Sequence, residues 1–247
     1  MPFVTTCRFT TLLLFSLFYA QTASSQQPVG NSTRSLAPQQ KVLRGIYQEL
    51  IEINTTDSVG DTTKAAEAMA ARLHAAGFSA ADVRVLIHPG NSLRGNLVAR
   101  YRSANPKRKP LLLLAHLDVV EARKEDWSEN LDPFKLTERD GYFYGRGTSD
   151  DKAMAAIFVA NLIQYKQENA QFDRDIIVAL TAGEESGDFN GAQLLLDHHR
   201  DLVSAEFGIN EGGGGRHRKG VKLLNGVQAS EKIYQSFLLE VRNKGGH

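Results

Sequence analysis

LLLLAHLDVV, residues Leu111–Val120, places two polar side chains inside an otherwise apolar run. Its first five residues have the continuous apolar character expected of a strand that is buried on both faces of a sheet. His116 and Asp118 follow two residues apart, at the point where such a strand would leave the sheet. A lone histidine there is commonly a core residue with one hydrogen bond, so its meaning depends on what the neighbouring strands supply.

Helical and strand patterns alternate along the rest of the chain. Apolar residues at helical spacing predict four helices, over residues 38–54, 61–76, 151–170 and 192–203. Short apolar runs predict strands over residues 82–88, 95–102, 110–120, 174–180 and 205–210. This alternation predicts an α/β fold with a mostly parallel sheet and helices on both of its faces.

The last segment has a different pattern. Residues 232–242, KIYQSFLLEVR, alternate between apolar and polar side chains, which predicts a half-buried strand. A strand that starts a new sheet here suggests that residues 227–247 open a second, α+β domain that is cut off within this sequence. Residues 38–226 are then expected to form the first domain.

The N-terminus predicts export from the cytoplasm. Arg8 precedes the short apolar run TLLLFSLFYA, and small and polar residues follow it, which is the pattern of a secretory signal peptide over residues 1–25. A Ser-, Gln- and Pro-containing linker is expected over residues 26–37. The predicted location is therefore secreted or periplasmic, without a membrane anchor after cleavage. The net charge of +1 gives no case for nucleic-acid binding.

Acidic residues occur at the ends of other predicted strands. Glu184 and Glu185 follow the strand 174–180, and Glu211 follows the strand 205–210. Asp150 and Asp151 lie directly before the long helix. Because ligands of open α/β sheets bind beyond the carboxyl ends of the strands, these residues are expected to share one rim with His116.

Clustered carboxylates repel one another, and they need protonation, basic neighbours such as Arg146 and Lys152, or a bound cation. One histidine with several carboxylates and no thiolate favours zinc, or else manganese or cobalt. The number of carboxylates suggests two ions. The adjacent pair Glu184 and Glu185 suggests that one binds metal while the other takes a proton from water.

Five short motifs carry a resemblance to a known family. They are HLDVV (116–120), GRGTSDDK (145–152), TAGEE (181–185), NEGGGG (210–215) and NKGGH (243–247). In this order they resemble the co-catalytic zinc metallopeptidases, a superfamily that contains aminoacylases, carnosinases, glutamate carboxypeptidases and succinyl-diaminopimelate desuccinylases. The resemblance runs from about residue 38 to the last residue and implies a zinc exopeptidase-like catalytic domain followed by a lid and dimerisation domain.

The resemblance implies a role for each motif residue in binding two divalent ions. His116 and Glu211 would bind one ion, Glu185 would bind the other, and Asp150 would bridge them. Asp151 falls where family members vary, which implies that it is a bystander.

Three further residues would have catalytic roles. Glu184 matches the general base, and Asp118 matches a carboxylate that orients the ligand histidine. His247 matches a lid-domain histidine that, in family homodimers, reaches the partner's active site and stabilises the oxyanion.

The implied activity is metal-dependent hydrolysis of an amide bond in a small peptide or an N-acyl amino acid, of the carboxypeptidase or dipeptidase type. Deacylation of N-acyl amino acids is an alternative that uses the same residues. An inactive metal-binding fragment is the alternative of another class, because the family's last ligand histidine lies downstream of the lid.

Overall fold

The computed structural model describes residues 36–212, 214–226, 235, 237–243 and 245. The predicted signal peptide, residues 26–35 of the linker, and His247 lie outside this part of the chain, so the predictions made for them stay predictions. Among the helices that are described, none combines the length and the apolar character needed to cross a membrane.

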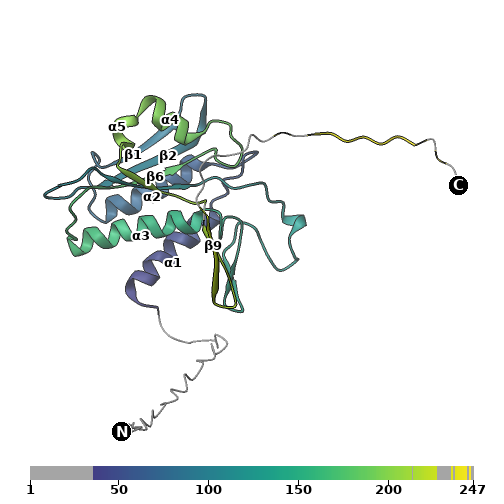
Figure 1. The fold of residues 1–247 in the computed structure, drawn as a ribbon, viewed down its shortest axis with the longest axis horizontal. Coiled ribbons are helices and arrows are strands. Elements are labelled where there is room, and N and C mark those ends of the chain that lie inside the picture. Colours follow the sequence, from purple (N-terminus) through teal and green to yellow (C-terminus); the bar gives the residue numbers. More distant parts are fainter. Residues whose placement is uncertain (1–35, 213, 227–234, 236, 244, 246–247) are drawn as a thin grey trace, which may run out of the picture. The chain divides into compact units, whose positions relative to one another are not determined.

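A five-stranded sheet with the order β1-β2-β6-β3-β7 forms the centre of the fold (Figure 1). Its strands are β1 (Val83–His88), β2 (Asn91–Tyr101), β3 (Leu111–His116), β6 (Ile176–Thr181) and β7 (Phe207–Ile209). β3 is parallel to β6 and β7, whereas β2 is antiparallel to both β1 and β6. Four strands therefore run in one direction and β2 alone is reversed. The predicted α/β class with a mostly parallel sheet is confirmed.

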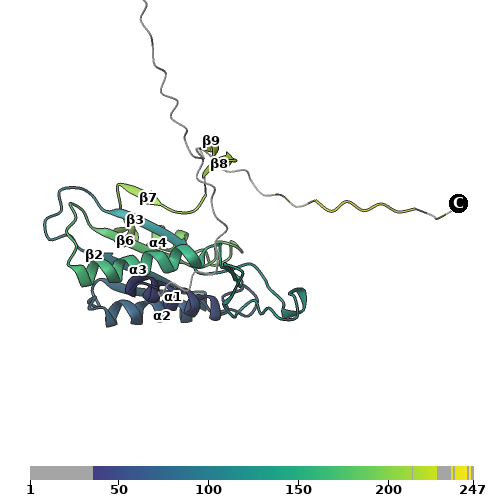
Figure 2. The ribbon, with the colours of Figure 1, turned by 90° about the horizontal axis from the view of Figure 1, so that it is seen from below.

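Helices cover both faces of this sheet, as predicted (Figure 2). The larger core contains residues of α1 (Pro38–Glu52), α2 (Thr62–Ala75) and α3 (Lys152–Glu168), and the other face carries α4 (Gly191–His198) and α5 (Arg200–Val203). All six residues of β6 are buried. Val178 and Leu180 belong to the larger core, and Ile177 and Ala179 to the smaller one. This explains why the strand reads as a continuous apolar run.

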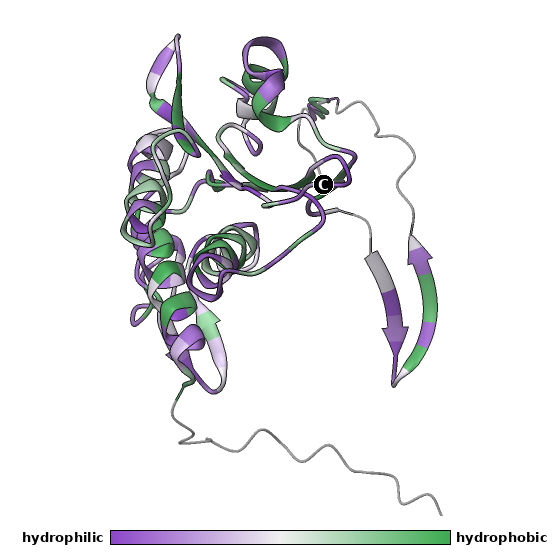
Figure 3. Ribbon diagram, turned by 90° about the vertical axis from the view of Figure 1, so that its left-hand side faces the viewer, coloured by the Kyte–Doolittle hydropathy of each residue, from purple (hydrophilic) through white to green (hydrophobic). Residues whose placement is uncertain are grey.

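The hydropathy of the elements follows the same layers. Figure 3 shows the central strands largely in the hydrophobic colour and the helices with mixed faces. The single helix predicted over residues 192–203 is divided into α4 and α5 at His199, whose φ and ψ angles of −140° and 33° are not helical.

Two hairpins and a short 3₁₀ helix complete the described elements. They are η1 (Lys124–Asp126), β4 (Thr137–Arg139) with β5 (Tyr142–Tyr144), and β8 (Gly214–Arg218) with β9 (Val221–Gly226). Asp140 and Gly141 form the first turn at φ angles of 54° and 79°, the positive values that an Asp-Gly hairpin turn requires. The second hairpin is not among the strands predicted from the sequence.

The strand predicted over residues 232–242 is not found in the described part of that segment. Residues 235 and 237–243 belong to no strand. Phe237 and Leu239, expected on the buried side, are 84% and 88% exposed. A half-buried strand requires a hydrogen-bonded neighbour and a covering layer, and these described residues have neither.

A tight contact between Gly191 and Asn96 holds the loop after β6. The Asn96 side chain accepts a hydrogen bond from the Ala182 N–H at 2.9 Å and donates one to the Leu86 carbonyl at 3.0 Å. The Gly191 N–H donates to the Ala182 carbonyl at 2.7 Å. A Cβ atom at position 191 would lie 1.7 Å from Asn96 Oδ1, so no side chain fits without displacing this amide.

We therefore expect Gly191→Ala to lower the free energy of unfolding by about 1–3 kcal/mol, the usual cost of overpacking. Urea denaturation followed by circular dichroism measures it. Gly208→Ala is the matched control, because a Cβ there meets no atom within 4 Å. Equal stability of the two variants would contradict the proposed close contact.

Candidate metal centre

His116 is fixed at the end of β3 with one nitrogen facing outwards. Its side chain is 2% exposed, and Nδ1 lies 2.9 Å from the backbone carbonyl of Asp118. The next residue is held to β6, because the Leu117 N–H donates to the Thr181 carbonyl at 2.7 Å. A carbonyl beside Nδ1 requires the proton on that nitrogen, which leaves the lone pair of a neutral ring on Nε2.

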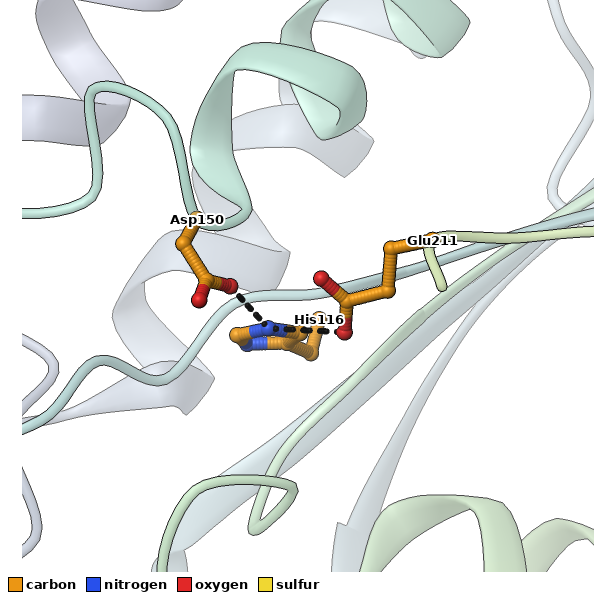
Figure 4. A group of neighbouring side chains, drawn as sticks. All are labelled: His116, Asp150 and Glu211. Carbon is orange, nitrogen blue, oxygen red and sulfur yellow. Dashed lines mark hydrogen bonds and ion pairs between the residues drawn. The ribbon is translucent and has the colours of Figure 1, made fainter. Parts of the chain in front are cut away.

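Three carboxylates surround Nε2 of His116. The nearest oxygens are those of Asp150 at 2.9 Å, Glu211 at 3.3 Å and Glu184 at 3.9 Å. Figure 4 shows Asp150 and Glu211 pointing toward the imidazole from two different segments, the loop before α3 and the loop after β7. The ligand atoms of His116, Asp150 and Glu211 all lie within 4.8 Å of one another.

A second group of possible ligands shares His116. The ligand atoms of His116, Glu184 and Glu185 also lie within 4.8 Å of one another. Glu185 is held in place by its backbone, since its N–H donates to Asp118 Oδ2 at 2.9 Å. Asp118 thus connects the loop after β3 to the loop after β6.

Asp118 faces His116 mainly through its backbone. The carbonyl contacts the ring at 2.9 Å, whereas the carboxylate oxygen Oδ1 lies 3.7 Å from Nδ1. That oxygen is buried and has no hydrogen-bond partner among the described residues. The orienting role of the Asp118 carboxylate stays a prediction, since in this structure the carbonyl of Asp118 contacts the ring and Oδ2 bonds to the Glu185 N–H.

The crowding of charges shifts several pKa values. Burial lowers the pKa of His116, but the carboxylates of Asp118, Glu211 and Glu184 outweigh burial, so the net shift is upward. Burial raises the pKa of Glu185, and the charge of Asp150 adds to the rise. These shifts are those of a site with an excess of negative charge, which a bound cation would relieve.

Asp151, which the resemblance implies to be a bystander, is buried and contacts the backbone of His116. Its side chain is 3% exposed, and Oδ2 accepts a hydrogen bond from the His116 backbone N–H at 3.3 Å. Burial raises the pKa of this carboxyl to about 7. The sequence could not show this, because adjacency to Asp150 does not reveal which of the two side chains points into the protein.

The donor set fits a divalent metal ion. One imidazole and four carboxylates converge, and Nε2 of His116 faces carboxylate oxygens on its open side. Nitrogen and oxygen donors without sulfur suit zinc, manganese or cobalt. Arg146, one of the expected basic neighbours, instead donates to the Glu121 carbonyl at 3.3 Å and lies over the Trp127 ring.

The chain is similar to known proteins in sequence and in fold. Residues 112–230 match the model of Peptidase family M20/M25/M40. The chain is 40% identical over 117 residues to a probable succinyl-diaminopimelate desuccinylase of Staphylococcus epidermidis, covering 47% of this chain and 27% of that protein. It is 29% identical over 169 residues to aminoacylase-1 of Sus scrofa, covering 68% of this chain and 40% of that protein.

Solved structures share the fold at low identity. Human carnosine dipeptidase 1 matches with a TM-score of 0.54 and 20% identity, covering 72% of this chain and 42% of that chain. An M20 family metallo-carboxypeptidase of Sulfolobus solfataricus matches with a TM-score of 0.58 and 19% identity, covering 72% and 38%. The chain therefore spans less than half the length of these relatives.

Proposed function

Because the chain carries a domain of peptidase family M20, we propose that it is a metal-dependent hydrolase of an amide bond in a small peptide or an N-acyl amino acid. One observation carries the proposal. His116 Nε2 lies within 3.9 Å of carboxylates from three separate loops, those of Asp150, Glu184 and Glu211. The named relatives are hydrolases of peptide or amide bonds.

Four residues would hold two divalent ions, and zinc is the ion we propose first. His116 and Glu211 would bind one ion, Glu185 the other, and Asp150 would be shared between them. Two bound ions would polarise the scissile carbonyl and lower the pKa of the attacking water. The protein positions the ligands from backbone contacts, such as those of Asp118 with the His116 ring and with the Glu185 N–H.

Glu184 is the residue we propose as the general base. Its side chain is 53% exposed, so the carboxylate is open to water and substrate, and its oxygen is the most distant of the three from His116 Nε2. Glu185 is held by its backbone to Asp118 and is more buried. Glu184 would take a proton from the attacking water and return it to the leaving amine.

The substrate class is tested by comparing dipeptides with N-acyl amino acids. We expect the full chain to hydrolyse one of these panels with added zinc, manganese or cobalt, and to lose the activity on addition of a chelator. Chromatographic quantification of the released amino acid measures hydrolysis in both panels. Zinc binding without release of amine from either panel would overturn the hydrolase proposal and support a metal-binding protein without turnover.

Export is a separate part of the proposal and rests on the predicted signal peptide. We expect expression of the full chain in a secretory host to give a product outside the cytoplasm whose N-terminus lies after residue 20, 23 or 25. N-terminal sequencing of that product measures the cleavage site. An intact N-terminus on a cytoplasmic product would contradict export.

A further inference from the structure

Lys152 is the largest fully buried side chain of the described structure, and no step proposed above uses it. It is the first residue of α3 and stands two positions after Asp150. Its side chain is 0% exposed, and Nζ donates a hydrogen bond to the carbonyl of Ile53 at 2.7 Å. Burial of an ammonium group is costly unless its contacts are well formed, so this contact requires an explanation.

The contact reaches a loop that supports the histidine segment. Ile53 is the first residue after α1, and the next residues of the loop contact the chain beyond β3. Thr55 Oγ1 donates to the Leu117 carbonyl at 2.7 Å, and the Val119 N–H donates to the Thr55 carbonyl at 3.3 Å. These two hydrogen bonds hold the segment that carries His116 and Asp118 against this loop.

The loop is itself closely folded. Asn54 Oδ1 accepts hydrogen bonds from both the N–H and the hydroxyl of Thr56, each at 2.9 Å. The Gly60 N–H donates to the Thr56 carbonyl, and the Asp61 N–H to the Asn54 carbonyl, each at 3.0 Å. Thr55 and Thr56 are almost fully buried. Because these hydrogen bonds fix the shape of the loop, displacing one end of it also displaces the other end.

We propose that Lys152 is a positioning residue that fixes the His116 segment relative to Asp150, through the loop Ile53–Thr55. The connection starts at Lys152, which lies two residues after Asp150 and whose Nζ bonds to the Ile53 carbonyl. It ends at Thr55, which bonds to the backbone of Leu117 and Val119 on either side of Asp118. The role rests on the metal centre of the proposed function, and it concerns metal affinity rather than hydrolysis.

A purely electrostatic role predicts the opposite result from a positioning role. A protonated Lys152 would place a positive charge two residues after Asp150, and a positive charge near the site repels a metal ion. If charge alone mattered, replacing Lys152 with the uncharged methionine would strengthen zinc binding. If position matters, the same change releases the loop, and zinc binding weakens.

Isothermal titration of the full chain with zinc separates these roles. We expect Lys152→Met to weaken zinc binding by about 10–100-fold, as is usual when a residue that supports a ligand is lost. Thr55→Val removes the hydroxyl contact with Leu117 and is expected to weaken zinc binding in the same direction. Because both act through one loop, the double variant is expected to lose less affinity than the sum of the single variants.

Leu162→Ala is the matched control, since Leu162 is a fully buried residue of the same helix and lies ten positions after Lys152. It should lower the thermal unfolding temperature and leave zinc affinity unchanged. Unchanged or tighter zinc binding by Lys152→Met, additive effects with Thr55→Val, or an equal loss in Leu162→Ala would overturn the proposal. If Lys152→Met does not fold, unchanged affinity in Thr55→Val overturns it instead. A native chain that binds no zinc would overturn the metal centre as well.

Discussion

Replacement of Glu184 by glutamine should lower kcat for the amide substrate by about 10²–10⁴-fold, the contribution typical of a general base. Glutamine keeps the size of the side chain but cannot accept the proton of the attacking water. Zinc should remain bound, because Glu184 is the most distant of the three carboxylates around His116 Nε2. Steady-state kinetics with zinc titration on the same preparation measures both quantities.

Glu138→Gln is the matched control for this change. Glu138 lies on β4 and pairs with Arg44 at 3.5 Å, and its side chain is exposed. The same loss of one carboxylate there should leave kcat and zinc affinity at the native values. A Glu184→Gln variant with native kcat would rule out Glu184 as the base, and loss of zinc along with activity would instead assign it to metal binding.

Replacement of His116 by alanine should weaken zinc binding by at least about 100-fold, the upper end of the effect of losing a residue that only supports a ligand. His116 is the one side chain common to both groups of possible ligands. Zinc at 100 times its Kd should stabilise the native protein by about 2.7 kcal/mol. At the same zinc concentration, this stabilisation should fall to about 0.4 kcal/mol or less in the variant.

Differential scanning calorimetry with and without zinc measures that difference. His198→Ala is the control, because His198 is an exposed residue at the end of α4 and belongs to neither ligand group. It should keep the full zinc-dependent rise in unfolding temperature. An equal rise in His116→Ala would show that zinc binds elsewhere on the protein.

The parts of the fold that depend on a local sequence pattern were predictable. The apolar runs of β3 and β6 indicate strands covered on both faces, and Asp140-Gly141 indicates a hairpin turn. Strand order was not predictable, because it depends on which strands pair across long connections. The hairpin of β8 and β9 was missed since its glycines suit a loop as well as a strand, although Lys219-Gly220 at φ angles of 49° and 79° is a turn-forming pair.

The gathering of His116 with four carboxylates follows from the strand ends, because elements that finish at one rim place their next residues together. Which residue does which chemistry stays a prediction. The support beneath the site was not predictable. Asp151 and Lys152 read as a charged pair at the start of a helix, and only the packing of α3 against the loop after α1 shows that both are buried.

Because β2 runs in the reverse direction, the turn before it and the connection after it lie at opposite ends of the sheet's strands. Leu97 of β2 pairs with Leu180 near the end of β6, and His116 of β3 pairs with Thr181, so the turn before β2 is on the side of His116. The connection after β2, residues 102–110, leaves from the opposite end of the strands, where Tyr101 pairs with Ile176. A fluorophore, affinity tag or inserted peptide placed in that basic connection would be attached to the protein without entering the region where a substrate must approach.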